Sequence, residues 1–96
     1  MFIIALTYQK SLEEVDAHLS AHVAFLKANY AKGIFLASGR KNPRNGGIIL
    51  ALAASKAEIE AVIAYDPFYI HSVATYEITE FTPTMTSPEL DFLINR

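Results

Sequence analysis

The order of strand-like and helix-like segments constrains the fold of this chain more than any other sequence feature. Four short apolar runs are rich in the β-branched and aromatic residues that favour strands. Two longer stretches carry apolar residues at helical spacing. The predicted strands span residues 2–8, 34–37, 48–53 and 72–81, and the predicted helices span residues 11–32 and 55–65. This order predicts an α+β, ferredoxin-like βαββαβ fold, in which two helices cover one face of a four-stranded antiparallel sheet.

Local signals mark the ends of both helices. Residues 11–14 and 55–58 each read Ser-x-x-Glu, which is the capping-box pattern. Gly33 follows the first helix where a C-terminal glycine is common. Pro67 disfavours helical geometry at the residue before it, so the second helix should end by Asp66. An apolar stripe predicts which side of the first helix packs on the sheet, and it consists of Leu12, Val15, Leu19, Val23, Leu26 and Tyr30.

The first and third strands do not have the pattern of a half-solvated sheet. FIIAL and IILALA are apolar at consecutive positions, whereas a sheet with one wet face alternates apolar with polar residues. Another layer should therefore cover the second face of the sheet, and a second copy of the chain is the simplest cover. We expect a homodimer that pairs through its sheet faces.

Composition restricts the classes of function. The 96 residues include no cysteine, and the net charge is −2, so disulfides, thiol ligands and a globally basic nucleic-acid surface are excluded. No apolar run reaches the ~18 residues that span a bilayer, and the N-terminal run lacks the pattern of a signal peptide. We expect a cytoplasmic protein without nucleic-acid or membrane partners. Residues 1–83 should form one domain, followed by an extension at residues 84–96 with a short helix at 88–94.

His22 and Asp66 are ionisable residues with apolar neighbours, where an unpartnered charge is costly. Asp66 would either cap a helix or turn, or orient and charge-stabilise an imidazole. His22 lies on or beside the apolar stripe of the first helix. It would be either a core-edge histidine with backbone or water partners, or a proton-transfer group. Both predicted helices pack on the same sheet face, but the sequence spacing does not show that the two side chains meet.

A metal site is an alternative for the histidines. His18 and His22 are four residues apart on one helical face, a spacing that occurs in zinc sites. The intervening residues lack the glutamate of the protease motif, and a third ligand would have to be Asp66 or His71. We therefore expect no metal and no other cofactor, with His18 at the solvated edge of the helix.

The segment SGRKNPRNGG, residues 38–47, is predicted to be a loop between two strands. Its basic residues and glycine N–H groups would suit an anion or a substrate carboxylate. A solvated connection without a ligand is the other interpretation. The basic residues are Arg40, Lys41 and Arg44.

Five segments, taken in order, resemble the YCII-related (YciI-like) family of the dimeric α+β barrel class. They are HVAFL at 22–26, KGIFLASGR at 32–40, GGIILA at 46–51, DPF at 66–68 and ITEF at 78–81. The resemblance implies a ferredoxin-like protomer that dimerises through its sheets. Relatives often carry an arginine close to the helix histidine, where this chain has Leu19 and Val23. They also often read SGP or AGP where this chain reads SGR.

The resemblance further implies that His22 and Asp66 form a catalytic pair, with Ser38, Gly39 and Arg40 at the rim of the same pocket. One function is then a cofactor-independent lyase or isomerase, dehydrochlorinase-like as in some relatives, that uses general acid–base chemistry on a small cyclic or aromatic substrate. Arg40 would hold a polar substituent of that substrate. The apolar pocket walls would be Tyr8, Phe25 and Phe68. The alternative is a non-catalytic small-molecule-binding or regulatory dimeric module.

Overall fold

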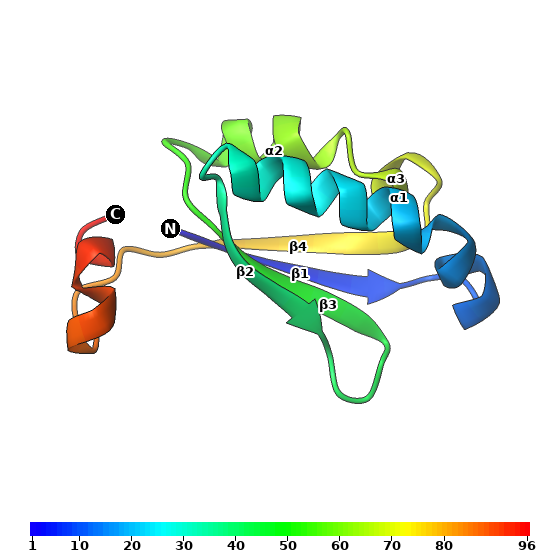
Figure 1. Cartoon of the computed structure of the whole chain (residues 1–96), viewed down its shortest axis with the longest axis horizontal. Helices are drawn as coiled ribbons and strands as arrows, with labels where there is room; N and C mark the ends of the chain where they lie inside the picture. Colours follow the sequence, from blue (N-terminus) through cyan, green and yellow to red (C-terminus); the bar gives the residue numbers. More distant parts are fainter.

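A computed structural model describes all residues from 1 to 96. It contains the predicted elements in the predicted order and one short helix, α3, that was not predicted (Figure 1). The elements are β1 (Phe2–Tyr8), α1 (Leu12–Ala31), β2 (Phe35–Arg40), β3 (Gly46–Ala51), α2 (Lys56–Ile63), α3 (Pro67–Ile70), β4 (Ala74–Glu80) and the 3₁₀ helix η1 (Pro88–Leu93).

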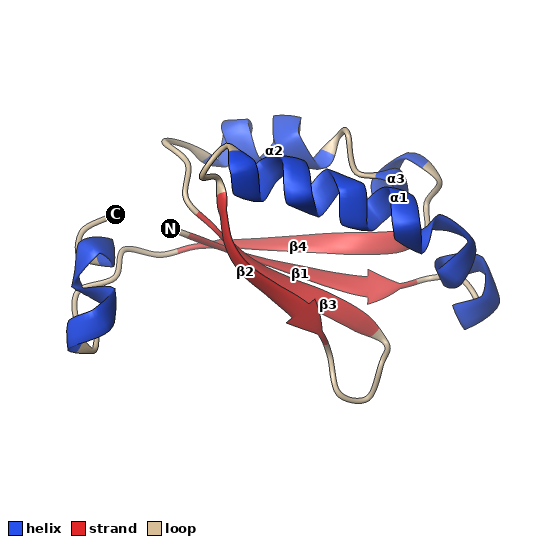
Figure 2. Ribbon diagram, viewed as in Figure 1, coloured by secondary structure: helices blue, strands red, loops and turns tan.

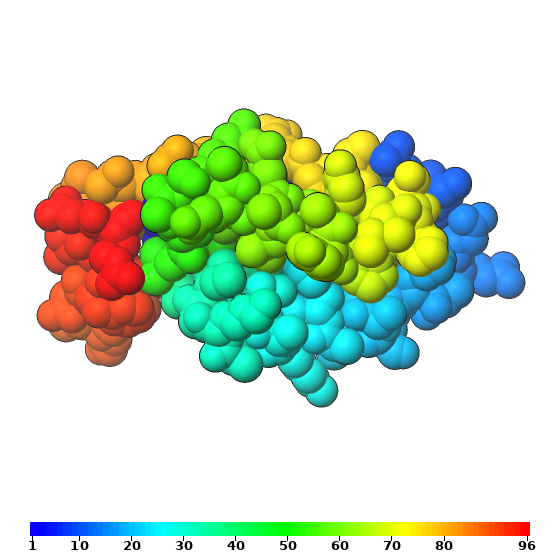
Figure 3. All heavy atoms as spheres, turned by 90° about the horizontal axis from the view of Figure 1, so that it is seen from above, coloured from blue at the N-terminus to red at the C-terminus, as the bar shows by residue number.

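The four strands form one antiparallel sheet in the order β2-β3-β1-β4. Helices α1, α2 and α3 all lie on one side of it (Figure 2), which confirms the ferredoxin-like prediction. From above, α1 and the α2–α3 segment cover the sheet as two neighbouring bands (Figure 3). The centre of the core is strand β1, whose residues Phe2, Ile4 and Leu6 face the helices and are at most 2% exposed.

The predicted loop at residues 38–47 is shorter than the sequence suggested. Residues 38–40 extend β2 and residues 46–47 begin β3, because Gly39 pairs with Ile48 and Arg40 with Gly47. Gly46 packs so closely on β1 that an added Cβ would lie 1.8 Å from the carbonyl oxygen of Leu6. Glycine here permits close strand packing, so only residues 41–45 remain as a turn.

The predicted apolar stripe of α1 is also corrected. The fully buried side of the helix is formed by Val15, His22, Phe25 and Asn29. Leu19, Val23 and Tyr30 are 36–37% exposed, on the flank of α1 beside the edge strand β2. His22 therefore lies in the middle of the buried side, and the polar residues on that side have hydrogen-bond partners within the chain.

The segment after α2 turns sharply at Asp66. Helix α2 ends at Ile63, before Asp66 as predicted, and Pro67 then begins the four-residue helix α3. Asp66 is its N-cap: the carboxylate accepts a hydrogen bond from the backbone N–H of Phe68. Proline suits this first helical position, because no hydrogen bond from its nitrogen is needed there.

The C-terminal segment projects from the end of the sheet where β1 begins and β4 ends, and its helix η1 stands apart from the two layers (Figure 1). The ammonium group of Met1 donates a 2.7 Å hydrogen bond to the backbone oxygen of Arg96, which ties the two termini together. None of the helices has the length and apolar character required to cross a bilayer.

Candidate active site

Three elements bring polar side chains together beneath the middle of α1. His22 comes from the buried side of α1, Asp66 from the turn that begins α3, and Tyr76 from the helix-facing side of β4. Asp66 is 0% exposed and His22 is 8% exposed. Chain segments that are 44 and 54 residues apart from His22 in sequence therefore converge on one buried cluster.

The Asp66 carboxylate is the centre of this cluster. Its Oδ1 atom lies 2.7 Å from Nδ1 of His22 and accepts a 2.9 Å hydrogen bond from the N–H of Phe68. Its Oδ2 atom accepts a 2.5 Å hydrogen bond from the hydroxyl of Tyr76. An ionised carboxylate only accepts hydrogen bonds, so three surrounding donors suit the charged form and place a proton on Nδ1 of His22.

The imidazole of His22 is fixed from its face as well as from its edge. It stacks on the ring of Phe68 with 3.9 Å between centroids and 3° between planes. The second ring nitrogen, Nε2, has no hydrogen-bond partner in the chain and is not a fully buried atom. With Nδ1 protonated, Nε2 has a free lone pair, which makes it the atom available to a ligand.

Burial and the neighbouring carboxylate shift the pKa of Tyr76 in the same direction. Burial of the phenol raises the pKa of Tyr76 above its usual value, and the negative charge of Asp66 and the hydrogen bond to it raise this pKa further. The phenol therefore remains protonated and acts as a hydrogen-bond donor in neutral solution.

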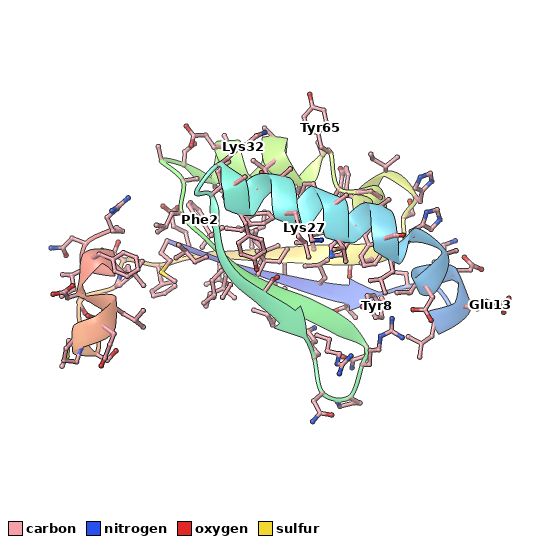
Figure 4. The ribbon with its side chains drawn as sticks, in the orientation of Figure 1. Phe2, Tyr8, Glu13, Lys27, Lys32 and Tyr65 are labelled. Atoms are coloured by element: carbon pink, nitrogen blue, oxygen red, sulfur yellow. The ribbon has the colours of Figure 1, made fainter.

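A hollow of about 160 Å³ opens between α1 and the β2–β3 edge of the sheet. An apolar cavity of ~150 Å³ is large enough to bind benzene, so the space suits a single ring. Tyr8, which contributes to its wall, stands at the end of β1 near the 41–45 turn (Figure 4). Six of the residues predicted to form the site line this hollow: His22, Tyr8, Ser38, Gly39, Arg40 and Phe68.

The two remaining predicted residues do not line the hollow. Asp66 lies behind His22 and reaches the site through its 2.7 Å contact with that imidazole. Phe25 is one helical turn further along α1 and packs in the core, with its ring 5.7 Å from that of Phe35. The rest of the lining is mainly aliphatic and includes Leu6, Leu19, Val23, Leu26 and Ile49.

The polar groups at the rim differ in whether they have a partner within the chain. The hydroxyl of Ser38 lies 2.5 Å from that of Tyr30 on α1. Arg40 is exposed and has no ion-pair partner in the chain, whereas Arg44 on the following turn pairs with Asp16 at 2.5 Å. Arg40 is thus the cation at this rim that is free to meet a ligand.

Tyr76 was missed by the sequence interpretation, although a signal was present. In β4 the polar residues Thr75, Glu77 and Thr79 alternate with Ala74, Tyr76 and Ile78. Because alternate residues of a strand share a face, this pattern places Tyr76 on the helix-covered face, together with the layer that contains His22 and Asp66.

His18 lies one helical turn from His22 but has different neighbours. Its ring stacks on that of His71, with 4.3 Å between centroids and 16° between planes. No group of three or more histidine, aspartate or glutamate side chains in the chain is arranged to hold a metal ion.

Comparisons with known proteins agree with the observed fold. The model of the YCII-related domain family matches residues 1–82. A search of curated protein sequences found no match. Among solved structures, the fold is similar to that of 5-chloro-2-hydroxyhydroquinone dehydrochlorinase from Burkholderia phenoliruptrix AC1100 in complex with 2,5-dihydroxybenzoquinone. The TM-score is 0.71 at 17% sequence identity, and the match covers 85% of this chain and 94% of the other.

Proposed function

The chain belongs to the YCII-related domain family, and on that premise we propose that it is a cofactor-independent lyase or isomerase acting on a small cyclic or aromatic compound. His22 is its catalytic residue, and Asp66 orients and charge-stabilises the imidazole. The observation that carries this proposal is the position of His22. One ring nitrogen contacts a fully buried carboxylate, and the other is unpartnered in a side chain that lines the hollow.

The proposed chemistry begins with Nε2 of His22 acting as a general base. It removes a proton from an acidic O–H or C–H bond of the substrate, and the released electron pair forms a new C=O or C=C bond. In an elimination, the C–Cl bond breaks as the new double bond forms, chloride leaves with the electron pair of its own bond, and the imidazolium then releases its proton to water. In an isomerisation, the imidazolium returns the proton to another carbon. Asp66 stabilises the imidazolium between these two steps.

The lining of the hollow favours a planar ligand with one anionic or strongly polar substituent. Aliphatic side chains and Phe68 form most of the walls. Arg40 lacks an internal ion-pair partner, so its guanidinium is available for an ionised hydroxyl or a carboxylate. A hydroxylated quinone or hydroquinone, the class of compound named for the similar dehydrochlorinase, has both features.

An assay that measures the release of chloride from a chlorinated hydroxyhydroquinone tests this function. His22→Gln should lower kcat/KM by roughly 10²–10⁴-fold, the usual contribution of general acid–base catalysis. His18→Gln is the matched control, because it changes a histidine one turn away that does not line the hollow. Full activity of the His22→Gln protein, with the amide NMR spectrum of a folded chain, would exclude the assignment.

The alternative, a non-catalytic binding module, predicts a different result with the same compounds. Calorimetry would detect binding of 2,5-dihydroxybenzoquinone, but no proton-transfer turnover would be found, and His22→Gln would change affinity only slightly. Arg40→Gln should weaken binding under either function, so it confirms the location of the ligand and leaves the His22 variant to decide between them.

We further propose that a second copy of the chain covers the open face of the sheet. Ile3 pairs with Leu50, and Ala5 with Ile48, on the face opposite the helices, where these side chains are only half-buried. The edge strand β4 adds polar residues, including Glu77 opposite Ala5. An apolar centre with a polar border is the usual anatomy of a protein interface.

Light scattering at low micromolar concentration tests the homodimer. The expected mass is about twice the 10.6 kDa of one chain. Leu50→Glu, at the apolar centre of the face, should dissociate the dimer, whereas Thr79→Glu at the polar border should not. A stable wild-type monomer under these conditions would contradict this assembly.

A further inference from the structure

The Asp66 carboxylate has one oxygen that His22 does not reach. Oδ1 contacts Nδ1 of His22 and the N–H of Phe68, whereas Oδ2 accepts its only hydrogen bond in the chain from the hydroxyl of Tyr76. We propose that Tyr76 is the positioning residue of this site. Its hydroxyl fixes the carboxylate in the orientation that holds the proton of His22 on Nδ1 and leaves Nε2 free toward the hollow.

The carboxylate needs this second anchor because both of its other contacts converge on one oxygen. A side chain held through Oδ1 alone can still turn about its Cβ–Cγ bond, which changes the direction of the lone pair that His22 meets. The tautomer of a histidine is set by the partner of its opposite ring nitrogen. A bond to Oδ2 therefore affects the availability of Nε2, although Tyr76 itself has no hydrogen bond to the imidazole and does not line the hollow.

Tyr76 is itself held rigidly enough to position Asp66. Its backbone lies in β4, opposite Leu6 of the central strand β1. Its ring packs edge-on against Tyr69, with 5.8 Å between centroids and 74° between planes. Because its hydroxyl remains protonated in neutral solution, Tyr76 donates to Asp66 across the pH range in which histidine works as a base.

Nitrogen-15 NMR of the His22 ring tests this role without any substrate. The chain contains only three histidines, so a background with His18→Gln and His71→Gln leaves one imidazole to observe. Tyr76→Phe removes the hydroxyl and keeps the ring. We expect the Nδ1 proton to exchange with water about tenfold faster, near the equilibrium factor for one charge-assisted hydrogen bond. We also expect signals of the tautomer protonated on Nε2.

Tyr69→Phe is the matched control, because it removes a hydroxyl from the ring packed against Tyr76 and leaves the bond to Asp66 in place. Its His22 signals should match those of the background protein. A folded Tyr76→Phe protein with the same His22 signals as Tyr69→Phe would overturn the proposal.

If Tyr76→Phe does not fold, the background chain with 3-fluorotyrosine in place of Tyr76 is used instead of that variant. The more acidic phenol binds Oδ2 more strongly and weakens the acceptor facing His22, so an upfield shift of the Nδ1 proton is expected and an unchanged shift overturns the role. The catalytic importance of Tyr76 rests on the proposed function, but this spectrum does not. A shift supports positioning even if His22→Gln retains turnover, and its absence excludes positioning even if turnover is lost.

Discussion

His18 and His22 occupy the same face of α1, one helical turn apart, yet they have opposite environments. His22 is buried between a carboxylate and the parallel ring of Phe68. His18 is only half-buried and meets another imidazole, that of the exposed residue His71. Both sets of partners come from residues 66–71. The helix therefore supplies two similar side chains, and the segment around α3 decides which of them becomes part of a polar cluster beside a hollow.

The largest loss of stability should come from removing the Asp66 carboxylate, which contacts His22. Asp66→Ala leaves three donors without an acceptor, at a residue that is 0% exposed, and removes the N-cap of α3. Breaking a buried pair in this way costs about 3–5 kcal/mol, so the free energy of unfolding in urea should fall by that amount. Asp66→Asn, which keeps one acceptor oxygen, should lose less. Equal losses of unfolding free energy for Asp66→Ala and His71→Ala would contradict the difference between the surroundings of His22 and His18.

A smaller loss of stability should appear in alkaline solution. Burial and Asp66 raise the pKa of Tyr76 in the folded chain, so the folded state keeps this proton after the unfolded chain has lost it. The stability contributed by the protonated phenol is complete below the unfolded value of ~10 and is lost above it, by about 1.4 kcal/mol per pH unit. Urea unfolding between pH 8 and 11 should therefore show a steeper decline for the wild type than for Tyr76→Phe. Parallel curves would mean that Tyr76 is not coupled to Asp66.

The fold was predictable where the signals were local. Both Ser-x-x-Glu segments cap helices as expected, with Ser11 and Ser55 accepting from the N–H of Glu14 and Glu58. Strand β1 has the predicted bounds. The ends of β2 and β3 were mispredicted because glycines that usually mark a turn here lie in the paired strands, where Gly46 permits close packing on β1. That packing depends on pairing between distant strands, which no local pattern encodes.

The site was predictable in part, and for different reasons. His22 and Asp66 were chosen as residues that share a layer and match a family pattern, and the structure brings them into contact. Phe25 was predicted in the pocket wall, but it packs inward against Phe35. Tyr76 was not predicted, although the alternation of polar and apolar residues in β4 places it on the helix-covered face. The direction of a side chain depends on helix rotation and strand face, and proximity in sequence does not determine either.

The smallest loss of stability should follow from breaking the stacked pair of His18 and His71. His71→Ala removes the ring stacked on His18, but both residues face solvent more than His22 does, and no other hydrogen bond or ion pair depends on the His71 imidazole. Surface substitutions of this kind usually change stability by no more than about 0.5 kcal/mol. The urea unfolding curve should therefore nearly superimpose on that of the wild type, and the NMR signals of the His22 ring should not move. Movement of those signals would show that the two histidines are coupled through α3, and the buried cluster would then extend to the surface of the protein.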